Sequence, residues 1–166
     1  MSDKPAPWDA IHTRAASLSP DRRACFALAC AEHLVAVEKS TRGSSLREML
    51  SEGWAAWSGQ TGDLAAVLRA LEPREGLDED EVACVYYALD GVARAGPRDA
   101  TIWASQRAID AAYARVPRSE GAATFRPLDE DTAMPVVQSE FRWQDRVLQI
   151  LETNADLAEA GQQVRS

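Results

Sequence analysis

Alanine is frequent throughout this sequence, β-branched runs are nearly absent, and apolar residues recur three and four positions apart. This spacing is the period of an α-helix that buries one face, whereas a half-buried strand needs strict alternation. The 166 residues suffice for a substantial core and match the usual length of one domain. The sequence therefore predicts a single all-α domain, a bundle of six or seven helices arranged as antiparallel hairpins.

Capping residues and helix breakers set the expected limits of the helices. Ser19-Pro20 and Ser45 are typical helix starts, and Gly59 and Gly96 are typical stops. The expected helices run over about 20–39, 45–58, 61–72, 78–95, 98–116 and 137–160, with the fourth and fifth at the centre. Within the domain of residues 1–166 we expect flexible residues at 1–7, a long loop at 117–135 and a frayed tail at 161–166.

Acidic residues outnumber basic ones by 26 to 18, which gives a formal charge of −8. Such a charge repels nucleic-acid phosphates and anionic lipid but attracts basic protein surfaces, so we expect no nucleic acid and no membrane partner. The chain has no secretory signal pattern and no apolar run long enough to span a bilayer. Three cysteines among apolar residues fit a reducing compartment, which predicts a cytoplasmic protein.

Residue patterns for catalysis or metal binding are weak in this chain. Cys30 and His33 share one face of an expected helix, but further ligands at suitable spacing are absent, and a thiol facing the interior is normally inert. The nucleophile-elbow and nucleotide-binding glycine motifs do not occur. We therefore expect no catalytic residue, no metal and no cofactor.

Four polar residues fall where the helical period expects the interior. Glu140 and Gln144 share a stripe with apolar residues of the last helix, and Asp90 and Asp110 lie close to the apolar faces of the central pair. We interpret them as a buried hydrogen-bond network, with ligand binding or catalysis as the alternative. An enzyme would require Asp90, Asp110 and Glu140 to converge in an open pocket.

Clustered acids and an excess of tryptophan suggest a surface for a basic partner. The chain has five Trp but only three Phe, and Trp is over-represented in binding hot spots. The alternative is a solvated helix start and a solvated loop. Trp103 precedes Arg107 by one helical turn, a spacing that permits a cation–π contact. The predicted partner-binding residues are Asp78, Glu79, Asp80, Asp129, Glu130, Asp131 and Trp143.

Three stretches carry a family resemblance: residues 23–34 (RACFALACAEHL), 85–90 (VYYALD) and 135–144 (PVVQSEFRWQ). They resemble the helical immunity proteins of bacterial polymorphic toxin systems and a widespread all-helical bacterial family of unknown function. The resemblance covers about residues 18–152. It implies a small acidic cytoplasmic protein that binds a toxin, and it offers no catalytic residues to carry over.

Charge and resemblance together favour an immunity protein that neutralises a cognate, basic toxin by occluding its active site. The alternative is a non-catalytic helical module that binds another cellular protein or itself, with a Trp-containing surface as the seam of a homodimer.

Overall fold

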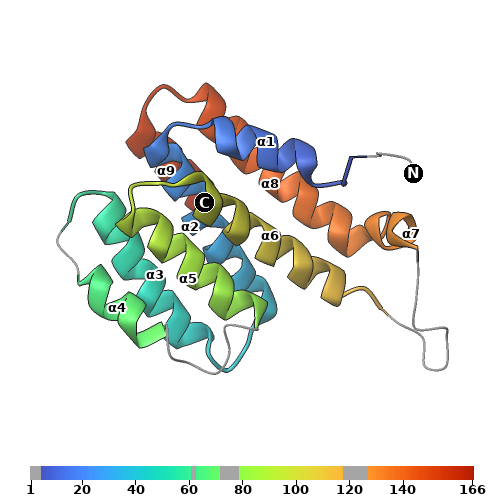
Figure 1. Ribbon diagram of the computed structural model, residues 1–166, viewed down its shortest axis with the longest axis horizontal. Helices are drawn as coiled ribbons and strands as arrows, with labels where there is room; N and C mark the ends of the chain where they lie inside the picture. The colour runs from blue at the N-terminus through green and yellow to red at the C-terminus, as the bar shows by residue number, and fades with distance from the viewer. Residues whose placement is uncertain (1–4, 61–62, 72–78, 118–126) are drawn as a thin grey trace.

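The computed structural model describes residues 5–60, 63–71, 79–117 and 127–166, and these are helical without any strand (Figure 1). The all-α prediction is confirmed. The described residues form nine helices: α1 (Asp9–Ser17), α2 (Pro20–Glu38), α3 (Gly43–Trp57), α4 (Leu64–Leu71), α5 (Asp80–Ala93), α6 (Arg98–Ala114), α7 (Leu128–Thr132), α8 (Pro135–Thr153) and α9 (Leu157–Arg165).

The most enclosed helix is α2, which α3, α5, α6, α8 and α9 surround. Its residues 24–31 are all buried, because small and apolar side chains follow one another around its whole circumference. Phe26, Leu28 and Leu34 supply the largest of its side chains to the core. The predicted central pair is present as the α5–α6 hairpin, but it packs against α2 rather than forming the centre alone.

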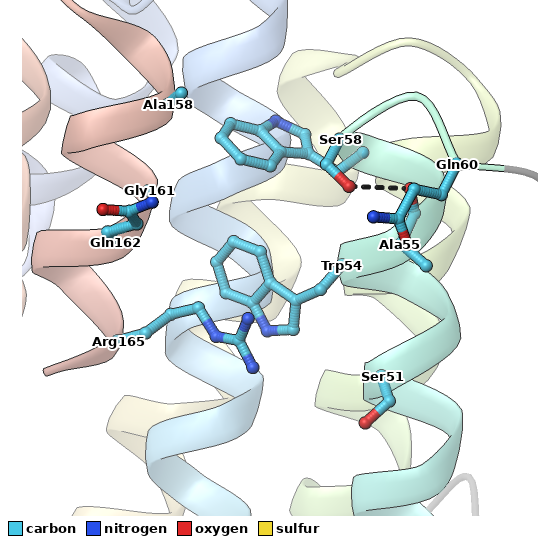
Figure 2. A pocket seen from close by; sticks show the side chains of 10 residues that line it. Ser51, Trp54, Ala55, Ser58, Gln60, Ala158, Gly161, Gln162 and Arg165 are labelled. Atoms are coloured by element: carbon cyan, nitrogen blue, oxygen red, sulfur yellow. Dashed lines mark hydrogen bonds between the residues drawn. The ribbon is translucent and has the colours of Figure 1, made fainter.

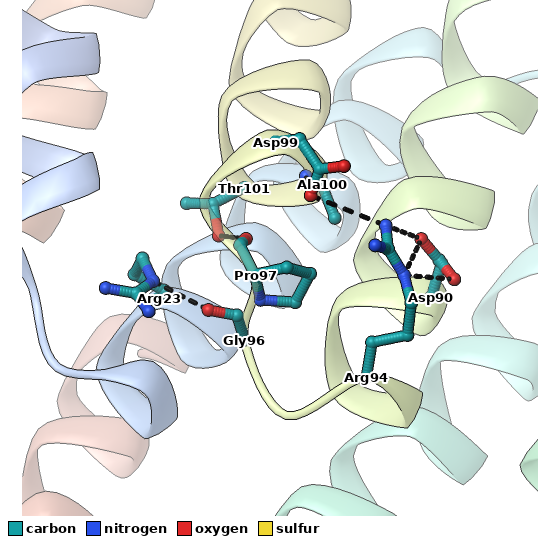
Figure 3. Close-up of polar contacts among 8 residues, drawn as sticks. All are labelled: Arg23, Asp90, Arg94, Gly96, Pro97, Asp99, Ala100 and Thr101. Carbon is teal, nitrogen blue, oxygen red and sulfur yellow. Dashed lines mark hydrogen bonds and ion pairs between the residues drawn. The ribbon is translucent and has the colours of Figure 1, made fainter.

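The short turn between α5 and α6 is tied to the start of α2 (Figure 3). Ala95 and Gly96 both have positive φ, and the Gly96 N–H donates to the Gly91 carbonyl at 2.6 Å. This pattern satisfies the last carbonyls of a helix. The Nε of Arg23 donates to the Gly96 carbonyl at 2.6 Å, so α2 fixes the position of the turn and of the α6 residues that follow it.

The helix count exceeds the prediction because of two short helices and one break. α1 and α7 are additional, and α7 lies inside the expected loop 117–135. The expected last helix ends at Thr153 and a new one begins after Asp156, whose carboxylate accepts the Glu159 N–H at 2.9 Å as an N-cap. The tail 161–166 is therefore not frayed: α9 continues to Arg165.

None of the helices in the described residues combines the length and the apolar composition that a bilayer crossing requires. The expected start of the third helix at 61–62 and its stop at Pro73 lie outside the described residues.

Candidate partner-binding surface

Acidic and aromatic side chains follow one another along the outer face of α6. Asp99, Trp103 and Asp110 recur at helical spacing, so they share one side of the helix. The Trp103 side chain is 52% exposed, which is unusual for so large an apolar group. Two side chains from α5, those of Asp80 and Tyr87, reach the same face. We call this surface the α6 strip; it consists of Asp80, Tyr87, Asp99, Trp103, Arg107 and Asp110.

The predicted acids at the start of α5 contribute one residue to the α6 strip. An oxygen of Asp80 accepts a hydrogen bond from Arg107 at 3.2 Å, and burial raises the pKa of this carboxyl while Arg107 opposes the rise. Glu79 is exposed and lies 3.3 Å from Arg42. Asp78 lies outside the described residues. Arg107 therefore binds Asp80, in place of the cation–π contact with Trp103 that the spacing permits.

The second predicted acidic group lies on α7, next to the C-terminal end of α6 (Figure 1). The hydroxyl groups of Tyr113 and Thr132 are 2.7 Å apart and connect the two helices. Asp129 and Glu130 are exposed, and Asp131 is half-buried. A hollow of about 740 Å³ separates α7 from residues 5–8. The two acidic groups thus flank the same helix, one beside its middle and the other at its end.

Trp143 lies apart from these acids, on the side of α8 that faces α2. Its ring stacks on the His33 imidazole, with centroids 3.9 Å apart and planes 8° from parallel. The Nε2 of His33 is in turn 3.3 Å from a Glu140 carboxylate oxygen. Trp103 is the aromatic residue beside the acids that the sequence prediction missed. The sequence pattern that could have identified Trp103 is its spacing of four residues from Asp99, which puts an aromatic ring one helical turn from a carboxylate.

Of the four polar residues predicted to be buried, Glu140 and Gln144 lie inside the protein and are hydrogen-bonded. Asp90 and Asp110 are only half-buried, so they do not belong to a buried network. Gln144 is fully buried, and its amide donates to a Glu140 oxygen at 2.8 Å and accepts from the Ser105 hydroxyl at 2.6 Å. The other two carboxylates have different partners: Asp90 binds Arg94, and Asp110 accepts from Gln106 at 2.7 Å. Asp90, Asp110 and Glu140 therefore do not converge on one pocket.

A second aromatic surface lies between α3 and α9, around a hollow of about 360 Å³ (Figure 2). Its two indole N–H groups are used within the protein: that of Trp54 donates to Glu32 at 3.0 Å, and that of Trp57 donates to the Asp21 carbonyl at 2.9 Å. The guanidinium of Arg165 lies 4.8 Å from the centroid of the Trp54 ring. The two indole hydrogen bonds hold α3 against α2, and the contact of Arg165 with Trp54 holds α9 against α3.

The three cysteines are buried and free. Burial raises the pKa of Cys25 to about 12 and the pKa of Cys30 and Cys84 well above the ordinary thiol value. Among the described residues, no three or more His, Cys, Asp or Glu side chains are grouped so that they could hold a metal ion. Cys30 and His33 thus have separate surroundings, a core position and a stack on Trp143.

We expect the native thiols to resist an aromatic disulfide reagent at pH 8. Thiolate is the reactive form, and burial keeps the Cys25 thiol protonated at this pH by raising its pKa to about 12. The release of coloured thiolate from the reagent measures the reaction. Protein unfolded in urea is the control, and all three cysteines should react there within minutes. Rapid labelling of one cysteine in the native protein would contradict the burial of that side chain.

Comparison with known proteins gives a likeness of fold. No family model matches the chain, and no curated protein matches it. A solved structure of a DUF416 family protein from Shewanella baltica OS155 has a TM-score of 0.69 and covers 98% of this chain and 92% of that chain. The two sequences are 16% identical, so the likeness shows the fold alone.

Proposed function

We propose that this protein is a non-catalytic immunity protein that binds a basic toxin through the α6 strip and α7. One observation carries the proposal: acidic residues from α5, α6 and α7 gather along α6 beside an exposed tryptophan, Trp103. A polar rim around an aromatic anchor is the usual composition of a binding hot spot. The formal charge of −8 adds long-range attraction for a basic surface.

Inhibition by occlusion suits this arrangement. The exposed carboxylates of Asp129 and Glu130 would meet the cationic cleft of the toxin first, and their charge would speed the encounter. The indole of Trp103 would then lose its remaining exposure in the complex, which slows dissociation. The toxin would be blocked because its cleft is covered, without any chemical change in either protein.

Capture of the partner from the native host, followed by mass spectrometry, tests the proposal first. We expect a basic toxin domain, bound with nanomolar or tighter affinity that weakens as salt is added. Reversing the charges of Asp129 and Glu130 to lysine should reduce this affinity at least about tenfold at low salt. The affinity is measured by calorimetry at two salt concentrations.

Glu48 and Glu52 on α3 provide the matched control, because both are exposed carboxylates on another helix. Their reversal to lysine changes the net charge by the same amount and should change the affinity by less than about twofold. An equal loss in both variants would show that only the total charge matters, and α7 would then not be part of the binding surface.

The exposure of Trp103 also favours the second candidate, a self-associating helical module with this residue in the seam of a homodimer. Light scattering after size-exclusion chromatography separates the two functions. A dimer that becomes a monomer on Trp103→Ala, with no toxin captured, would support self-association instead.

A further inference from the structure

A small surface pocket lies between α5 and α6, close to the turn that joins them. It has a volume of about 250 Å³ and is lined by Tyr87, Arg94, Asp99, Ala100 and Trp103. We call it the Trp103 pocket. The rings of Tyr87 and Trp103 are 5.1 Å apart between centroids and tilted by 56°. The pocket therefore has aromatic walls from two different helices.

Small residues at the base of the Trp103 pocket let the two helices approach each other. Ala100 is buried, and a Cβ added to Gly91 would lie 3.7 Å from the Ala100 Cβ, which is ordinary contact. The ring of Tyr87 lies one turn before Gly91 in α5, and the ring of Trp103 lies about one turn after Ala100 in α6, so both rings stand beside this level of small residues. The hollow is thus a consequence of the local sequence.

The charged groups at one edge of the Trp103 pocket carry a net negative charge. Arg94 donates from Nε to both carboxylate oxygens of Asp90, at 2.9 and 2.8 Å, while its Nη2 is 3.5 Å from Asp99 (Figure 3). Two carboxylates and one guanidinium sum to one negative charge. Asp99 is 62% exposed, so its carboxylate faces solvent at the entrance.

An exposed carboxylate beside two aromatic faces has the chemistry of a guanidinium receptor. The planar guanidinium of arginine stacks on Trp and Tyr rings and forms charge-assisted hydrogen bonds with carboxylates. Asp99 already attracts one such group, that of Arg94, at the rim. An anionic ligand would meet the negative charges of Asp90 and Asp99, and a purely apolar ligand would make no use of the exposed Asp99 carboxylate.

We infer that the Trp103 pocket binds an arginine side chain of the partner protein, with its guanidinium on the Trp103 ring and against Asp99. The identity of the partner rests on the proposed function, but the chemistry of the pocket does not. The pocket lies on the α6 strip, since Arg107, which binds Asp80, is one helical turn from Trp103. An arginine held there would align the basic surface of the partner with the acids further along α6.

A titration with two matched small molecules tests the inference without the partner. N-acetyl-arginine amide is added to isotope-labelled protein, and the indole N–H signal of Trp103, assigned with Trp103→Phe, is followed by NMR. We expect a saturable shift with a millimolar dissociation constant. N-acetyl-citrulline amide has nearly the same shape without the charge, and it should bind at least about fivefold more weakly.

Two variants locate the interaction. Asp99→Asn should weaken binding of the arginine probe by about fivefold, and Asp129→Asn on α7 should leave it unchanged. Equal binding of both probes, no binding of either, or an unchanged affinity in Asp99→Asn would overturn the inference. These results are independent of the toxin experiment: partner binding that needs α7 and Trp103 but is unchanged in Asp99→Asn would support the proposed function and reject the pocket.

Discussion

Replacing Gly96 by alanine is expected to lower the free energy of unfolding by about 3 kcal/mol, the combined result of backbone strain and steric overlap. Gly96 has a φ of +69°, a conformation that side chains with a Cβ rarely adopt. A Cβ built there would lie 2.6 Å from the carbonyl carbon of Pro20 and closer still to its oxygen. These Pro20 atoms belong to the backbone at the start of α2, so they cannot move aside as the end of a flexible side chain would.

The neighbouring residue provides the control for this prediction. Ala95 also has a positive φ, of 59°, at the position where helix ends favour glycine. Ala95→Gly should therefore leave stability unchanged or raise it by up to about 1 kcal/mol. Thermal unfolding followed by circular dichroism should show Gly96→Ala melting about 6–12 °C lower. Equal melting temperatures for Gly96→Ala and the natural protein would mean that the turn does not pack against Pro20.

The helices of the core follow from the sequence because their apolar period is strong and their ends are marked. α2, α6 and α8 begin within about two residues of the expected positions, each next to a proline. α7 could not be predicted in this way. Its five residues have little stability alone, and the contact of Thr132 with Tyr113 helps to hold it in place.

The candidate site was predicted less completely, because its assembly depends on contacts between distant residues. The helical period correctly placed Glu140 and Gln144 inside the protein. It could not show that Ser105, 39 positions away from Gln144, is the partner. Nor could it show that Trp143 stacks on His33 while Trp103 remains exposed, since both residues lie on amphipathic helices whose neighbours are set by the tertiary fold.

The second large effect is expected for Gln144→Leu, which should lower the free energy of unfolding by about 3 kcal/mol. The Gln144 amide joins α8 to α6 through both the hydroxyl and the carbonyl of Ser105, the latter at 3.3 Å, and it also donates to Glu140. Leucine fills a similar volume but removes the partner of the Ser105 hydroxyl and one partner of Glu140, inside a core that excludes water. An unpaired buried polar group costs about 1–3 kcal/mol. Urea unfolding followed by tryptophan fluorescence measures the loss.

Removing the partners along with Gln144 should recover part of this loss. In the variant Ser105→Ala, Gln144→Leu, Glu140→Gln, the buried charge and the orphaned hydroxyl are both gone, so the triple change should cost less than the sum of the three single ones. Additive losses would mean that the three side chains act separately and that no network exists.

Partner affinity provides the complementary measurement. If the network only fixes α8 against α6, the folded triple variant keeps its affinity. Asp129→Lys with Glu130→Lys, by contrast, leaves the buried network intact and loses affinity. A network variant that stays folded but fails to bind would instead place Glu140 and Gln144 in the binding site. That result would favour ligand binding, the alternative interpretation of these residues from the sequence.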